Sequence, residues 1–327
     1  MARTEEPASL AFRKSPLLPA IVTQVAKRIG LGPLLVRLFM SLVMAERTKR
    51  RAFEGYVPTH KDVFAAVFGK SGTNWMMQIA TQIAHRGEAE FEHIHDLVPW
   101  PDSPMRMSIQ LTDPGPSEGS PTGLRVIKTH NEAAFVPYHE DATYLTILRD
   151  PKEVLVSAYY FIGGGLDVIS HVDMDTWVEI GLQKRGGIAA AWAVHADSFW
   201  RWRDRRNVLV LGFPEVKREP RRCIERVAET MRVELSDAEL DRVLERSSFE
   251  YMHRHESKFG PPKPRFASEE DRPRMVRRGK TGATGEVLSP DQQVAIDRLC
   301  LAELARLDST LPYAELFELT DGAAKTG

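Results

Sequence analysis

The stretch VFAAVFGKSGTNW, residues 63–75, joins an apolar run to the start of a helical pattern. It predicts a strand, a short glycine-containing loop and a helix whose first N–H groups lack partners, which together bind an anion, most often phosphate. In the Walker A pattern a glycine, a lysine and a Ser/Thr end the loop, whereas here Lys70 begins it. The anion therefore need not be a triphosphate. The alternative is an ordinary turn capped by Ser71 or Thr73.

The composition indicates a globular protein without indicating its chemistry. The chain has 327 residues, 43% of them hydrophobic, which suffices for one large α/β domain or two small ones. A formal net charge of -1 argues against bulk nucleic-acid binding, because no basic excess is present to replace counterions along a phosphate backbone. Cys223 and Cys300 lie in apolar helical patterns, so we expect buried free thiols and a reducing, cytoplasmic location.

The N-terminal region carries an amphipathic pattern of its own. Residues 1–6 include two acids and no basic region ahead of an apolar core, which argues against a secretory signal. A helical face follows, with Arg37 and Ser41 opposite it and a basic run at 47–51 after it; its members are Leu34, Leu35, Leu38, Phe39, Leu42 and Val43. The stretch is shorter than the ~20 residues of a membrane span. The helix either packs on the core or makes a peripheral contact with an anionic membrane.

Strand and helix patterns alternate along the rest of the chain. Strands are predicted over 63–68, 124–127, 144–148 and 208–211. Helices are predicted over 74–85, 151–161, 188–202, 220–231, 237–244 and 291–307. This order predicts a single α/β domain whose central, mostly parallel sheet is flanked by helices. Ligands of such sheets bind at the carboxyl ends of the strands.

Cationic residues follow several of these strands. The second strand leads into Lys128-Thr129-His130 and the third into Arg149, while Arg277-Arg278-Gly279 opens a later loop. These groups converge on the edge of the sheet where Lys70 is expected, in a chain without overall positive charge. Such a cluster suits an anionic cofactor with two separate phosphate groups.

In this order, the motifs resemble those of the cytosolic-type sulfotransferases that use 3′-phosphoadenosine 5′-phosphosulfate (PAPS). The family's P-K-S-G-T-T-W matches residues 69–75 with two changes, and its K-T-H matches 128–130. Its R-[ND]-P-K-[DE]-x-x-x-S matches 149–157, and R-K-G appears as R-R-G at 277–279. The resemblance implies a P-loop-NTPase-like sulfotransferase architecture. It further implies an N-terminal helical extension over 1–55, a sulfotransferase domain over 56–312 and a C-terminal tail over 313–327.

The resemblance also implies roles for single residues. The 5′-phosphosulfate would be held by Lys70, Ser71, Gly72, Thr73 and Asn74. The 3′-phosphate would be held by Arg149, Ser157, Arg277, Arg278 and Gly279, and the adenine by Trp75, Phe213 and Phe249. Core packing is the alternative for Phe213 and Phe249. No metal is implied, and the product would be 3′-phosphoadenosine 5′-phosphate (PAP).

Sulfuryl transfer needs a base for the attacking hydroxyl and a cation for the leaving oxygen. His130 has the intrinsic pKa of a base and follows a strand. Lys70 fits the leaving oxygen, and Lys128 fits the sulfonate oxygens. These three are the predicted catalytic residues.

The acceptor is suggested only by class. Loops 92–116 and 161–174 are expected to line an apolar pocket for a small hydrophobic alcohol, phenol or lipid. The apolar side chains of this predicted pocket are Trp100, Met105, Met107, Phe135, Tyr138 and Phe161. Ala283-Thr284 replaces the family's Asp-Trp, which leaves the closure of loop 279–285 open. The common dimer motif of animal members is not matched, and the oligomeric state stays open.

Two other functions remain as alternatives. A nucleotide-dependent phosphotransferase is disfavoured by the position of Lys70 and by the lack of a clear magnesium carboxylate after a strand. A non-catalytic, membrane-associated nucleotide-binding module would not require Lys70, Lys128 and His130 together.

Overall fold

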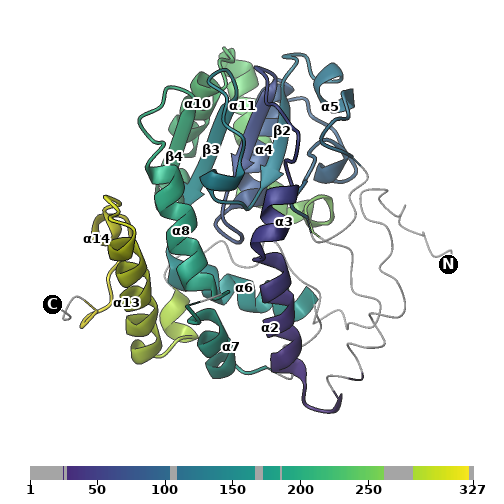
Figure 1. Cartoon of the computed structure of the whole chain (residues 1–327). Helices are drawn as coiled ribbons and strands as arrows, with labels where there is room; N and C mark the ends of the chain where they lie inside the picture. Colours follow the sequence, from purple (N-terminus) through teal and green to yellow (C-terminus); the bar gives the residue numbers. More distant parts are fainter. Residues whose placement is uncertain are drawn as a thin grey trace, which may run out of the picture.

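The computed structural model describes residues 25, 28–103, 109–165, 172–184, 186–260 and 283–323. Its centre is a four-stranded parallel sheet with the strand order β2-β1-β3-β4 (Figure 1). The strands are β1 (Asp62–Ala66), β2 (Arg125–Thr129), β3 (Thr143–Leu148) and β4 (Val208–Gly212). The predicted α/β architecture with a parallel sheet is confirmed, and each predicted strand is present within two residues.

Both faces of the sheet are covered, which explains why the strands read as continuous apolar runs. Side chains alternate along β1: Val63 and Ala65 enter one core cluster, whereas Phe64 and Ala66 enter another. The first face packs against α4 (Thr73–Ala84), α10 (Pro220–Thr230) and α11 (Asp237–Arg246), and these helices lie together in Figure 1. Ala66 pairs with Thr129 across the sheet, so β1 and β2 end side by side.

A second helical group lies beyond the carboxyl edge of the sheet. It comprises α6 (Pro151–Gly165), α7 (Met174–Gly181), α8 (Ile188–Trp200) and α13 (Pro290–Arg306). The six predicted helices are all present. Short elements complete the described chain: α3 (Glu46–Arg51), η1 (Ile94–Asp96), α5 (Gly115–Glu118), η2 (Ala133–Phe135), α9 (Phe213–Arg218), α12 (Phe249–Arg254), η4 (Glu256–Lys258), η5 (Ala283–Glu286) and α14 (Tyr313–Leu316).

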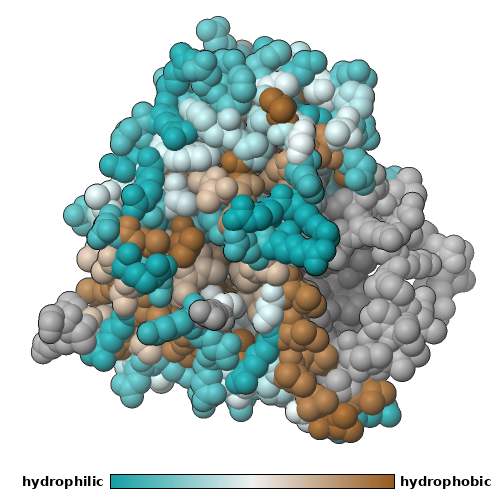
Figure 2. Space-filling model, in the orientation of Figure 1, coloured by the Kyte–Doolittle hydropathy of each residue, from teal (hydrophilic) through white to brown (hydrophobic). Residues whose placement is uncertain are grey.

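The N-terminal amphipathic pattern forms α2 (Gly32–Val43), and its two sides have different environments. Val36 and Met40 are buried in the core, with Leu35 and Phe39 packed beside them. The remaining leucines of the predicted apolar face are exposed, and Figure 2 shows them as a brown strip over α2. The prediction of a single apolar face that packs on the core is therefore wrong in detail. The buried side of the helix is instead centred on Val36 and Met40.

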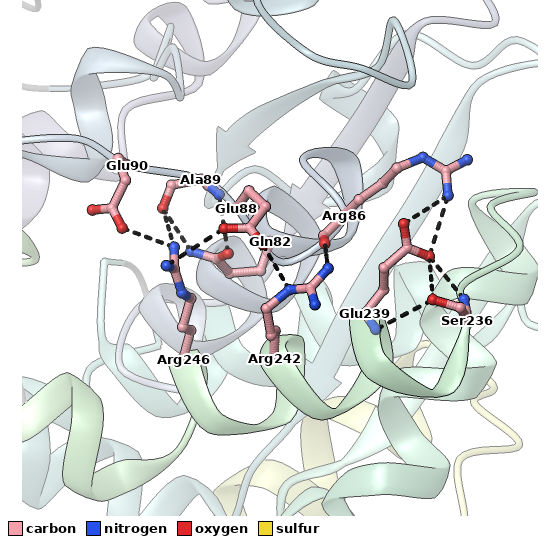
Figure 3. A network of polar contacts seen from close by, with 9 residues as sticks. All are labelled: Gln82, Arg86, Glu88, Ala89, Glu90, Ser236, Glu239, Arg242 and Arg246. Atoms are coloured by element: carbon pink, nitrogen blue, oxygen red, sulfur yellow. Dashed lines mark hydrogen bonds and ion pairs between the residues drawn. The ribbon is translucent and has the colours of Figure 1, made fainter.

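A network of charged side chains fixes the carboxyl end of α4 to α11 (Figure 3). Arg86 Nη1 lies 3.2 Å from Glu239 Oε1, and Arg242 Nε lies 2.7 Å from Glu88 Oε1. Arg246 Nη1 donates to the Ala89 carbonyl at 3.1 Å. Because α4 begins at the loop that follows β1, this network also limits how far the beginning of that helix moves.

A buried ion pair joins α6 to α13 and to the C-terminal segment. Lys152 Nζ lies 2.7 Å from Asp297 Oδ1, and the Asp297 side chain is 0% exposed. Tyr313 Oη donates to the same carboxylate at 2.6 Å, and Thr320 N–H donates to it at 2.9 Å. Residues 313–323, predicted to be a tail, thus contribute Tyr313 and Phe317 to the core. Cys223 and Cys300 are free and buried, as expected.

Lys152→Met tests how strongly this pair holds the domain together. The change leaves the Asp297 carboxylate buried without its cation, so we expect a loss of about 3–5 kcal/mol in the free energy of unfolding. Arg306→Met on α13 is the control, because Arg306 is 61% exposed and pairs with Glu303 at the surface. It should cost no more than about 1 kcal/mol. Equal losses in urea titrations of the two variants would contradict this role for the buried pair.

Candidate active site

The loop between β1 and α4 has the backbone shape of an anion site. Lys70 and Gly72 adopt left-handed conformations, with φ of 67° and 103°. A Cβ on Gly72 would lie 3.2 Å from the Phe213 ring, so a side chain at this position would crowd Phe213. The Ser71 hydroxyl oxygen is buried and has no hydrogen-bond partner among the described residues. A buried hydroxyl without a partner is costly in a protein interior, which fits a loop built to receive an oxyanion.

The beginning of α4 is left open for a ligand. Its N-cap is Gly72, with no side-chain cap, so the alternative of a turn capped by Ser71 or Thr73 is wrong. The first helical hydrogen bond runs from Met76 N–H to the Gly72 carbonyl. The preceding N–H groups of the helix have no helical acceptor and carry the positive end of the helix dipole.

Side chains of the first turns of α4 bind carbonyls that follow α11. Asn74 Nδ2 donates to the Phe259 carbonyl at 2.8 Å, and Trp75 Nε1 donates to the Ser247 carbonyl at 2.8 Å. The Trp75 ring meets the Phe213 ring edge to face, with centroids 5.7 Å apart. Phe249 lies close in sequence to Ser247, is 39% exposed and stacks on His253, so the core-packing alternative is wrong for Phe249.

Two lysines meet aromatic faces at the carboxyl edge of the sheet. Lys70 Nζ lies 3.9 Å from the centroid of the Phe161 ring. Lys128, which is 3% exposed, places its Nζ 3.3 Å from the Trp100 centroid. Burial, with Arg149 nearby, lowers the pKa of Lys70 to about 7. Burial also lowers the pKa of Lys128 to about 7; Asp102 opposes this shift and Lys70 adds to it.

His130 is held in a defined orientation near both lysines. Its Nδ1 lies 2.7 Å from the Val67 carbonyl oxygen, which accepts but does not donate. The neutral ring therefore carries its proton on Nδ1 and leaves the lone pair on Nε2. Burial, assisted by the charge of Lys128, lowers the pKa of His130 to about 3. The imidazole is thus unprotonated at neutral pH, the form that accepts a proton, and a pKa this far below 7 also makes it a weak base until a bound anion raises that pKa.

Asp102 belongs to this site although the sequence analysis did not single it out. Its Oδ2 accepts the His130 backbone N–H at 2.7 Å, while its Oδ1 is buried and unpartnered among the described residues. Burial raises the pKa of Asp102 to about 6. The sequence holds no motif that marks Asp102. Trp100, two residues before it, meets the His130 ring edge to face, with centroids 5.4 Å apart.

Arg149 supports the loop that carries Lys70. Its Nη1 donates to the Lys70 carbonyl at 2.9 Å, its Nε pairs with Glu153 at 2.9 Å, and its guanidinium lies 4.5 Å from the Phe213 centroid. Ser157 lies two turns into α6 and is partly exposed. Arg277, Arg278 and Gly279 fall outside the described residues. Their contact with a 3′-phosphate, like that of Arg149 and Ser157, stays a prediction.

The predicted acceptor pocket is changed by the structure. Trp100 and Phe161 lie beside the two lysines, as described above. Tyr138 is misplaced by the prediction, because it stacks on Tyr144 and donates to Asn207 at the opposite, amino end of the sheet. Phe135 packs under cations of α3, where the Arg50 guanidinium lies 5.1 Å from its centroid. Met105 and Met107 lie outside the described residues.

Residues 60–308 match the family described as the sulfotransferase domain. The chain belongs to this family. Human sulfotransferase 1C2 is 24% identical over 246 residues, which cover 71% of this chain and 78% of that protein. Sulfotransferase 2A1 of Macaca fascicularis is 25% identical over 280 residues, covering 84% of this chain and 94% of that protein.

Solved structures show the same fold. Retinol dehydratase in complex with androsterone and the inactive cofactor PAP aligns with a TM-score of 0.65 at 17% identity, over 82% of this chain and 87% of that one. Mouse sulfotransferase SULT7A1 complexed with PAP aligns with a TM-score of 0.57 at 19% identity, over 81% and 91%. The sulfotransferase fold predicted from the motifs is confirmed.

Two features are absent from the described residues. These residues contain no group of three or more His, Cys, Asp or Glu residues arranged to hold a metal ion. Within the same residues, no helix has the length and apolar character needed to cross a membrane.

Gly72→Ala tests the backbone requirement of the sulfotransferase loop. The left-handed conformation and the approach of Phe213 to 3.2 Å should together cost about 1–3 kcal/mol of stability. Displacement of Phe213 should also weaken PAP binding, measured by calorimetry, roughly tenfold or more. Gly69→Ala is the matched control, because a Cβ there meets nothing within 4 Å. A Gly72→Ala protein as stable as Gly69→Ala, with unchanged PAP affinity, would refute this account.

Proposed function

We propose that this sulfotransferase transfers the sulfuryl group of PAPS to a hydroxyl of a small hydrophobic acceptor, with His130 as the general base. The observation that carries the proposal is the orientation of His130. Its Nδ1–H is occupied by the Val67 carbonyl, so Nε2 is the unprotonated atom, and the ring lies in a partly exposed position near two lysines.

The residues present fit a phosphosulfate donor. The unpartnered Ser71 hydroxyl, the uncapped start of α4 and the left-handed Lys70 and Gly72 would hold its sulfonate and 5′-phosphate oxygens. Trp75 and Phe213 would enclose the adenine, and Phe249, already partly exposed, would complete that slot. The PAP molecules in two structural relatives support the same donor.

The reaction then follows from what these side chains do. His130 Nε2 takes the proton of the attacking hydroxyl as the new O–S bond forms. The S–O bond to the 5′-phosphate breaks, and Lys70 neutralises the charge that develops on that departing oxygen. Lys128 holds the sulfonate oxygens, and Asp102 positions His130 through its backbone N–H.

Trp100 and Phe161 would give the acceptor side of the proposed site an aromatic lining. Both rings lie under the lysine ammonium groups, so an apolar acceptor meets them as its hydroxyl approaches His130. Names of relatives support a hydrophobic alcohol: a guinea-pig 3-beta-hydroxysteroid sulfotransferase is 24% identical over 213 residues, and retinol dehydratase has been solved with retinol and with androsterone. A hydroxysteroid, phenol or lipid alcohol is the proposed substrate class.

His130→Ala tests the assignment of the base. With labelled PAPS and a panel of hydroxysteroids, phenols and lipid alcohols, we expect turnover to fall by roughly 10²- to 10⁴-fold while PAP affinity stays unchanged. His60→Ala, at an exposed histidine ahead of β1, is the control and should keep full activity. A parallel collapse of PAP affinity and turnover in His130→Ala would make His130 a donor contact instead. Absence of turnover by the wild type across the panel would remove the proposed function.

The pKa values of the two lysines predict that the protein takes up protons when the donor nucleotide binds. Lys70 and Lys128 have pKa values of about 7 in the free protein, so both are largely neutral at pH 8. A bound anion raises these pKa values, so PAP should bind with uptake of about one to two protons at pH 8, where its own phosphates are already ionised. Its affinity should therefore fall as the pH rises through 7.

Calorimetry in buffers of different ionisation enthalpy measures this uptake. Lys128→Met should lower the uptake at pH 8 by about one proton. Lys61→Met, at an exposed lysine before β1, should leave it unchanged. PAP binding without proton uptake at pH 8, or with proton release, would show that the lysines are already charged in the free protein.

A further inference from the structure

An apolar stripe on α2 is a feature of the described surface that the catalytic proposal leaves unused. Leu34, Leu38 and Leu42 are 57%, 56% and 61% exposed, and Leu31 just before the helix is 40% exposed. Their spacing of three to four residues places them along one line of the helix. Figure 2 shows this stripe in brown directly below the hydrophilic α3. Leucine side chains gathered in this way mark an interaction surface.

The stripe is fixed in its outward position. Val36 and Met40 on the other side of α2 are 1% and 3% exposed, so rotation that buried the stripe would expose these core residues instead. Helix α2 is thus apolar on both sides, with one side supplying the core. An outer face of this kind is stable in water only at a cost, which contact with an apolar phase removes.

Positive charge surrounds the stripe. Residues 28–54 contain six basic and two acidic residues, and one of the acids, Glu46, is paired with Arg50. Arg37 is exposed next to the stripe, and Arg47 and Arg51 are exposed on the α3 segment that follows it. Leucines flanked by arginines match the two parts of an anionic bilayer surface, its acyl boundary and its phosphate layer.

We propose that the stripe of Leu31, Leu34, Leu38 and Leu42, with Arg37, Arg47 and Arg51, docks on the surface of an anionic lipid bilayer. The helix lies in the interface plane, with its leucines in the acyl boundary and the arginines at the headgroups. A bilayer suits this surface better than a protein does, because the charge beside the stripe is almost all of one sign and the leucines form an open line.

The docking surface is connected to the catalytic loop. Lys49 of α3 lies 2.7 Å from Glu132, and its carbonyl accepts a hydrogen bond from Asn131 Nδ2 at 3.2 Å. Asn131 directly follows His130. Docking therefore holds the acceptor side of the site near the bilayer, where a lipophilic alcohol is concentrated. This last step rests on the proposed function; the docking itself does not.

Sedimentation with vesicles tests the proposal on the full chain. The wild type should bind vesicles of phosphatidylcholine with about 30% phosphatidylserine more strongly than vesicles of phosphatidylcholine alone. Added salt should weaken this binding because it screens the charges. Leu34→Gln/Leu38→Gln/Leu42→Gln should lower the partition coefficient roughly a hundredfold on anionic vesicles. Val57→Gln, at a side chain that is 72% exposed elsewhere, is the control and should bind like the wild type.

A second variant, with its own control, tests the contribution of the arginines to lipid binding. Arg47→Gln/Arg51→Gln should bind anionic vesicles roughly thirtyfold less tightly and neutral vesicles unchanged. Lys61→Gln/Arg206→Gln, at exposed basic residues outside the stripe, should match the wild type on both. Circular dichroism, which reports the helical content including α2, and PAP affinity, to which α2 contributes no contact in the proposed site, should be unchanged in all variants and report that the fold is intact.

Three outcomes would overturn the docking. Wild-type protein that stays in the supernatant with both vesicle types would show that the stripe does not meet lipid. Vesicle binding that survives the triple leucine change would place the lipid contact elsewhere. A wild-type dimer that the triple change converts to monomer, without lipid binding, would make the stripe an interface between two copies. Because sedimentation needs no turnover, each result is separate from the outcome of the His130 experiment.

Discussion

The structure of this sulfotransferase depends on keeping two ammonium groups close together at one edge of a buried sheet. Lys128 lies near the end of β2 and Lys70 in the loop after β1, and these two strands end side by side. Each ammonium group lies over an aromatic ring, and burial lowers both pKa values to about 7. Two neighbouring cations in such a site destabilise the protein while no anion is bound. A bound anion offsets that cost. Cation–π contacts offset part of the cost in the meantime.

Much of the surrounding structure holds that arrangement in place. Arg149 binds the Lys70 carbonyl, and Asn74 and Trp75 tie the start of α4 to segments that follow α11. The ion pairs of Figure 3 fix the other end of the same helix. Side chain to backbone bonds are suited to this task because two of the acceptor carbonyls, those of Ser247 and Phe259, belong to buried residues that directly follow helical segments. The anion loop is thereby preorganised, without a side-chain cap that a ligand would have to displace.

The sequence predicts the sheet and the chemistry of the site better than it predicts orientation. The four strands are recognisable because burial on both faces makes them continuous apolar runs. The loop at 70–75 and the K-T-H at 128–130 are placed correctly at strand ends because parallel strands end at one edge. The tautomer of His130 was not predictable, since it depends on the Val67 carbonyl, 63 residues away in the chain. The prediction for Tyr138 is wrong because the chain turns back to the amino end of the sheet soon after Phe135, and the sequence does not indicate this turn.

The buried packing around Trp192 links the end of the chain to the anion loop. Trp192 Nε1 donates to the Arg149 carbonyl at 3.0 Å, and its ring meets Tyr313 and Phe317 edge to face, with centroids 5.8 Å and 5.5 Å away. Tyr313 and Phe317 emerge from a ribosome long after β1 and Lys70, because domains form in the order of synthesis. The first strands of a nascent chain can therefore meet before the support behind Arg149 has been made. We expect the anion loop to be held less firmly until Tyr313 and Phe317 pack against Trp192.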